Sequence, residues 1–219
     1  MVSGQKEPFV IRGKLFTSLD DGEKNAYLYD DNGVMVVGNE GRILFVGSTV
    51  PGEYSHYKVI NTQHLIIPGF VDAHVHYPQL PVIASYGASL LEWLDKYTFP
   101  EEVRYGDRSY ADARAAEFLA LILEKGVTSA AVFSTIHDVA LEALQVSNRD
   151  FGLNLVSGIT GMDRGAPDQL LVDLPAFKEI NQKAIERSRD IERFSYAITP
   201  RFALSCSEKM LDYCGQLLE

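Results

Sequence analysis

The stretch that decides the fold covers residues 66–76 and reads Ile66-Ile67-Pro68-Gly69-Phe70-Val71-Asp72-Ala73-His74-Val75-His76. In a β-strand, successive side chains point to opposite faces. Strict alternation along this strand predicts that Asp72, His74 and His76 share one face. A strand buried on both sides ordinarily carries aliphatic residues on both faces. An acid and two imidazoles on one face therefore indicate chemistry rather than packing.

The two histidines are the candidate ligands of a metal ion. Imidazoles that lie two residues apart on a strand can both reach one cation, and imidazole nitrogen is a common ligand of zinc. The alternative is a chance His-X-His pair, with one ring satisfied in the core and the other exposed. The preceding Pro68-Gly69 and the aligned Asp72 favour a zinc-type site with His74 and His76 as ligands.

Composition limits the class of protein. The 219 residues allow one large domain or two small ones, and 46% of them are hydrophobic, which is enough for a core. The formal charge of −10 argues against a nucleic-acid partner and favours a small neutral substrate. Cys206 and Cys214 would lie about 12 Å apart on one helix, too far for a disulfide bond.

The chain is expected to be a cytoplasmic protein. Without a disulfide framework, a reducing compartment is the default. The first seven residues carry no secretory signal pattern. The longest helical apolar run, residues 118–123, is far shorter than the roughly 20 residues that span a bilayer. No membrane association is therefore expected.

Residues 1–65 carry strand and turn signals. The apolar runs 34–38 and 43–47 flank a plausible hairpin turn in which Gly41 is available for positive φ. Residues 30–33, Asp-Asp-Asn-Gly, are a second turn signal. We expect a small β-sandwich-like domain here, incomplete by itself. The alternative is an N-terminal extension without a structural role.

Residues 66–219 alternate between strand and helix patterns. Strands are expected at 66–76, 127–135, 153–160 and 194–202, and helical patterns follow each of them. Ser109 is the expected N-cap of a helix that ends at Gly126, and residues 205–208 read as a capping box. Successive βα units favour a parallel sheet, either doubly wound or a barrel.

The position of the histidines favours the barrel. Metal-type residues gather at the carboxyl ends of barrel strands, and His74 and His76 end the first one. An eight-unit barrel takes about 250 residues, and residues 66–219 carry four units. We therefore expect the first half of a (β/α)₈ TIM-type barrel within a longer protein.

Residues 68–76 resemble the first-strand signature of the amidohydrolase superfamily of metal-dependent (β/α)₈ enzymes. Within it, the chain resembles the guanine deaminase branch through Gln79 and the segments 90–100, 134–137 and 199–208. The resemblance runs from about residue 68 to the end of the sequence and is weak across the β domain. The blocks 93–100 and 199–208 are the ones that point to the guanine branch.

The resemblance implies zinc-dependent hydrolysis of guanine to xanthine and ammonia, as a step of purine catabolism. His74 and His76 would match two zinc ligands, and Gln79, Arg201 and Phe202 would match purine-binding positions. The remaining ligands and the acidic proton shuttle would follow Glu219, so no catalytic proton shuttle is expected in this chain, which would be inactive alone. A homo-oligomer, a dimer, is implied for the complete enzyme.

The residues themselves leave alternatives open. Arg201 offers a rigid fork of donors for the O6/N7 edge of guanine, or it belongs to a structural ion pair. Phe202 covers a purine face or belongs to the core, and Gln79 contacts a purine edge or lies on the surface. His137, just after the second strand and so near the same rim, touches the site or, as we expect, caps the helix that follows it. Asp72 is expected to support His74.

Two other functions are compatible with the sequence. One is a related amidohydrolase that acts on another purine, a pyrimidine or a triazine. The other is a non-catalytic half-barrel that acts as an interaction module through an unpaired sheet edge and apolar helix faces. Acyl transfer and phosphate binding are disfavoured, because the sequence has no Gly-X-Ser-X-Gly or Gly-X-X-X-X-Gly-Lys motif.

Overall fold

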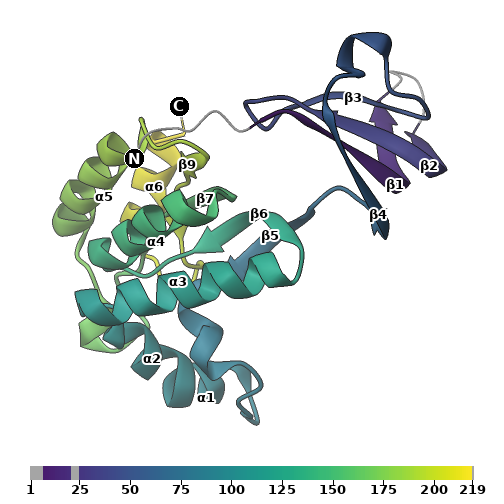
Figure 1. The fold of residues 1–219 in the computed structure, drawn as a ribbon. Helices are drawn as coiled ribbons and strands as arrows, with labels where there is room; N and C mark the ends of the chain where they lie inside the picture. Colours follow the sequence, from purple (N-terminus) through teal and green to yellow (C-terminus); the bar gives the residue numbers. More distant parts are fainter. Residues whose placement is uncertain (1–6, 21–24, 219) are drawn as a thin grey trace. The chain divides into compact units, whose positions relative to one another are not determined.

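The computed structural model describes residues 7–20 and 25–218. The chain falls into two compact units, Met1–Pro68 and Gly69–Glu219 (Figure 1). Residues 1–6, on which the expectation about a secretory signal falls, lie outside the described part. Within the described part, no helix is long and apolar enough to cross a membrane.

The first unit contains a four-stranded sheet in the order β3-β2-β1-β4. Its strands are β1 (Phe9–Asp20), β2 (Asn25–Val37), β3 (Ile43–Gly47) and β4 (Lys58–Ile66). The predicted hairpin is confirmed, because β2 pairs with β3 in antiparallel fashion and Gly41 has φ +75°. The expected sandwich is not confirmed, since the described strands of this unit form a single sheet.

The turn predicted at residues 30–33 is wrong. These residues continue β2, and the register runs from Gly13 opposite Gly33 to Leu15 opposite Asp30. Between these two pairs, β2 advances by three residues while β1 advances by two. The backbone N–H of Asn32 donates to Asp30 Oδ1 at 2.8 Å. This Asx turn produces a bulge within the strand rather than a reversal of the chain.

The second unit contains the predicted parallel sheet, with strand order β5-β6-β7-β9. The strands are β5 (Phe70–His76), β6 (Val127–Phe133), β7 (Asn154–Gly158) and β9 (Phe194–Tyr196). The helices are α1 (Leu90–Trp93), α2 (Phe99–Arg104), α3 (Arg108–Glu124), α4 (Asp138–Phe151), α5 (Leu174–Ser188) and α6 (Glu208–Gln216). Shorter helical turns cover Tyr77–Val82, Leu94–Thr98 and Asp168–Leu170. The fold of this unit is mixed α/β.

The core of this unit lies between the sheet and its helices, with α3 and α4 side by side (Figure 1). Ala130 and Val132 of β6 are buried against this helical layer. On the other face of the sheet, Val156 of β7 remains 42% exposed. One face of the sheet is thus covered by helices, and the described residues leave part of the other face open.

Two helix caps differ from the prediction by two residues each. Asp107 caps α3 by accepting the Tyr110 N–H at 2.8 Å, and Ser109 donates its hydroxyl to the same carboxylate. Ser207 rather than Ser205 caps α6. Acidic and hydroxyl side chains serve equally well as N-caps, so the position is set by where the chain turns. Gly126 follows α3 with φ +83°, as predicted.

A second, short parallel pairing lies beyond the carboxyl ends of the main strands. β8 (Thr160–Gly161) pairs with β10 (Thr199–Pro200). The N–H of Arg201 donates to the carbonyl oxygen of Gly161 at 3.0 Å. Further along, Asp163 accepts hydrogen bonds from both the N–H and the hydroxyl of Ser207, each at 2.6 Å. The loops after β7 and β9 are therefore fastened to each other.

Candidate active site

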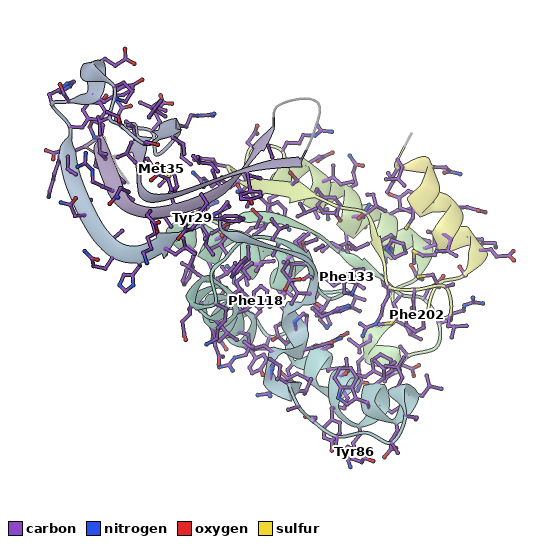
Figure 2. The ribbon with its side chains drawn as sticks, turned by 90° about the vertical axis from the view of Figure 1, so that its right-hand side faces the viewer. Tyr29, Met35, Tyr86, Phe118, Phe133 and Phe202 are labelled. Atoms are coloured by element: carbon purple, nitrogen blue, oxygen red, sulfur yellow. The ribbon has the colours of Figure 1, made fainter. Side chains whose placement is uncertain are left out.

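His74 and His76 lie at the carboxyl end of β5, and their rings converge. The two Nε2 atoms are 3.2 Å apart. Phe133, the last residue of β6, stacks on the His76 ring with centroids 4.7 Å apart and planes 11° from parallel. Phe133 is labelled in Figure 2. The histidine pair thus rests against an aromatic side chain of the neighbouring strand.

The even alternation predicted for β5 is wrong. The register pairs Asp72 with Ala130 and Val75 with Val132, so β5 advances by three residues while β6 advances by two. Asp72 Oδ1 accepts a hydrogen bond from the backbone N–H of His74 at 3.1 Å, and this Asx turn displaces the chain. Asp72 therefore acts on the backbone of His74, within a bulge, rather than continuing a regular face.

The spacing of the two Nε2 atoms fits a zinc ion. Two nitrogens that are each about 2.0–2.1 Å from a tetrahedral zinc lie roughly 3.3 Å apart, close to the observed 3.2 Å. Burial, followed by the charges of Arg201 and His74, lowers the pKa of His76 to about 4. The ring is therefore neutral at pH 7, the form that binds metals.

The ligand set for such a metal is incomplete within the described residues. A catalytic zinc takes three ligands from protein, and no described cluster of three or more His, Cys, Asp or Glu side chains could hold a metal. A metal-bound histidine also usually donates its second N–H to a partner. His76 Nδ1 is buried and has no such partner in the part of the chain that the structure describes.

A pocket of about 670 Å³ opens beside the histidine pair. It is lined by every residue that the sequence predicts for the site: His74, His76, Gln79, Arg201 and Phe202. The other lining residues are Val75, Leu80, Ile83, Leu90, Trp93, Leu94, Phe118, Leu121 and Ile122. Phe118 and Phe202 are labelled in Figure 2. A mostly apolar pocket with a few convergent polar groups suits a flat heteroaromatic ring.

Arg201 combines the two alternatives left open by the sequence. Its Nη1 donates to Glu102 Oε2 at 2.5 Å, and the two side chains are 4% and 1% exposed. Arg201 is therefore part of a buried ion pair, and it also lines the pocket. Burial raises the pKa of Glu102, whereas Arg201 and Gln79 lower it. The ion pair consequently forms one wall of the site rather than a separate structural feature.

Sequence reasoning missed Glu102, which lies in the first turn of α2. The dipeptide Glu101-Glu102 directly follows segment 90–100, one of those that carry the resemblance, and is not part of it. Acidic residues are favoured in the first turn of any helix, so the pair looks ordinary. What distinguishes Glu102 is that its buried carboxylate is paired with Arg201, which is 99 residues away in the sequence.

His137 lies outside the pocket lining. It occupies the N-cap position of α4, as predicted, but in the described structure its side chain makes no cap hydrogen bond, so only the position is confirmed. Burial lowers the pKa of His137. Its Nε2 atom is buried without a partner among the described residues.

Comparisons with known proteins identify the family of the chain. The sequence matches the Amidohydrolase family over residues 65–219. It is 34% identical to the guanine deaminase of Escherichia coli strain K12, over 228 residues that cover 100% of this chain and 52% of that protein. The chain thus spans about half the length of that relative.

Two solved structures are also similar. The guanine deaminase of Bradyrhizobium japonicum has a TM-score of 0.91 at 33% identity, covering 97% of this chain and 48% of that one. The guanine deaminase of C. acetobutylicum, solved with guanine bound in its active site, has a TM-score of 0.88 at 28% identity, covering 96% and 50%. These matches confirm that the chain resembles one portion, about half the length, of a guanine deaminase. The chain belongs to the amidohydrolase family.

Proposed function

We propose that the protein is a zinc-dependent aminohydrolase that converts guanine to xanthine and ammonia. The observation that carries the proposal is that His74, His76, Gln79, Arg201 and Phe202 line one pocket. The similarity to guanine deaminases, one of them solved with bound guanine, supports guanine as the substrate.

In this proposal, His74 and His76 are two of the zinc ligands. A bound zinc supplies a hydroxide at neutral pH by lowering the pKa of its water to about 7. The neutral state of His76, held by burial, keeps its lone pair available. We further propose that the remaining ligands and the proton-shuttling acid belong to residues other than 1–219.

The other pocket residues hold the purine. The Arg201 guanidinium presents donors to the O6/N7 acceptor edge of guanine. Gln79 can both donate and accept, which suits an edge that carries both kinds of group. Phe202, which is 37% exposed, covers a ring face. Together they fix the ring beside the histidine pair, which is the orientation that hydrolysis requires.

The architecture follows from the same proposal. Residues 1–65 form a small β domain, and residues 66–219 form the first four βα units of a (β/α)₈ barrel. The parallel strands β5, β6, β7 and β9 support this division, as does the histidine pair at their carboxyl end.

The test is ammonia release by the complete protein encoded by the gene that contains this sequence. The zinc-loaded protein is offered guanine, adenine, cytosine and a triazine at equal concentration, and xanthine is identified by its ultraviolet spectrum. Turnover of guanine at least a hundredfold above the other rings is expected. Preference for a different ring would replace guanine as the substrate. Absence of ammonia from all four would overturn the enzymatic proposal.

A further inference from the structure

Glu102 and Phe99, both on α2, hold the Arg201 side chain from two sides. Glu102 Oε2 accepts from Arg201 Nη1, and the Arg201 guanidinium carbon lies 5.5 Å from the centre of the Phe99 ring. All three side chains are nearly inaccessible to solvent. Because a guanidinium is planar, fixing one of its nitrogens against a carboxylate also fixes the directions of the remaining N–H groups.

Gln79, which also lines the pocket, is a second neighbour of the Glu102 carboxylate. Glu102 Oε1 is buried and lacks a partner of good hydrogen-bond geometry among the described residues. Gln79 is nevertheless near enough for its amide to lower the Glu102 pKa. Gln79 is therefore a close neighbour of the Glu102 carboxylate rather than a fixed hydrogen-bond partner. An amide N–H turned toward Oε1 would leave the Gln79 carbonyl free for a ligand.

We infer that Glu102 is a positioning residue, which orients Arg201 and Gln79 toward the substrate without touching it. The inference rests on the proposed function and deepens it, because it names the group that sets the donor pattern of the pocket. The carboxylate also neutralises the Arg201 charge, so that the wall facing a neutral purine carries no net charge.

A purely structural role explains this pair less well. Replacing a buried ion pair with apolar residues of similar volume is often neutral or stabilising. The adjacent Glu101 provides a contrast on the same helix. It accepts from Tyr110 and from Arg104, which line a separate surface pocket. Of the two neighbouring acids, Glu102 is the one whose partners line the candidate active site.

The experiment compares E102Q with E101Q in the complete protein. Glutamine keeps the shape of each side chain and removes the charge. We expect E102Q to raise KM for guanine by about tenfold to a hundredfold, the range for loss of one charged hydrogen bond, with a smaller change in kcat. E101Q is expected to leave both constants within about twofold of the parent. Circular dichroism checks that each variant is folded.

A second measurement separates positioning from general damage. If Glu102 acts through Arg201, E102Q should add no further increase in KM in an R201A background. If E102Q does not fold, E102D, which keeps the charge and withdraws it by one methylene, is measured in the same way. Unchanged KM in the folded variant, or an additive effect in R201A, overturns the inference while guanine turnover by the parent stands. A parent without guanine turnover overturns the proposed function itself, and with it this inference.

Discussion

Replacing Arg201 with leucine is expected to destabilise the fold strongly. The substitution leaves the Glu102 carboxylate, which is 1% exposed, without the guanidinium that donates to it at 2.5 Å. Removing one partner of a buried ion pair costs about 3–5 kcal/mol. With a urea m-value of about 2 kcal/mol/M, the midpoint of unfolding should fall by about 2 M.

Urea denaturation at pH 8 and pH 5.5 checks this magnitude and its cause. Burial raises the pKa of Glu102 and Arg201 lowers it, so the R201L variant has a still higher pKa at this carboxyl. A raised folded-state pKa means that the folded chain takes up a proton before the unfolded chain does as the pH falls. The loss of stability should therefore be smaller at pH 5.5 than at pH 8.

The double variant E102L/R201L provides the control. It removes both charges, so its free energy of unfolding should be higher than that of R201L alone. Two results would refute the reasoning: a midpoint for R201L within about 0.3 M of the parent, or a double variant that is less stable than R201L.

Three further outcomes are expected. The double variant H74N/H76N should no longer take up zinc, while its far-ultraviolet circular dichroism stays the same as that of the parent. A zinc content equal to that of the parent after dialysis would contradict the assignment of the two histidines as ligands. Gly158→Ala should lower Tm by several degrees, because a Cβ there would lie 1.9 Å from a backbone carbonyl oxygen, whereas Gly52→Ala, with no described atom within 4 Å of the new Cβ, should leave Tm nearly unchanged. Burial raises the pKa of Cys214 to about 11, so the unfolded chain loses the thiol proton before the folded chain does as the pH rises. The free energy of unfolding of the parent, relative to that of C214A, should therefore fall between pH 9 and 11. Equal pH dependence of the two proteins would contradict this expectation.

The sequence predicted the helix–strand order because its periodicities are local. In α3, five apolar residues recur at helical spacing in the sequence, and all five are buried: Ala111, Ala115, Phe118, Leu119 and Ile122. The ends of elements were harder to predict. Neighbouring residues such as Asp107 and Ser109 are equally able to cap a helix, and only the tertiary path of the chain selects one.

The candidate site was predictable to the extent that its signals are contiguous. His74 and His76 are two residues apart, so their pairing is visible in the sequence. Arg201 and Gln79 entered through the resemblance, since neither side chain is distinctive by itself. Glu102 was not predictable, because its importance comes from a partner distant in sequence. The bulge at Asp72 was hidden for a related reason, since it arises from one side-chain bond to the backbone.

The short β8–β10 pairing holds one wall of the pocket in place. The backbone of Arg201 is bound to Gly161, so the wall that carries Arg201 and Phe202 is tied to the loop after β7. The wall that carries α1 is more exposed, since Leu90 and Leu91 are 69% and 64% accessible to solvent. Amide protons near Arg201 should therefore exchange slowly with deuterium and those around α1 quickly. That exchange pattern would place the way into the pocket on the side of α1.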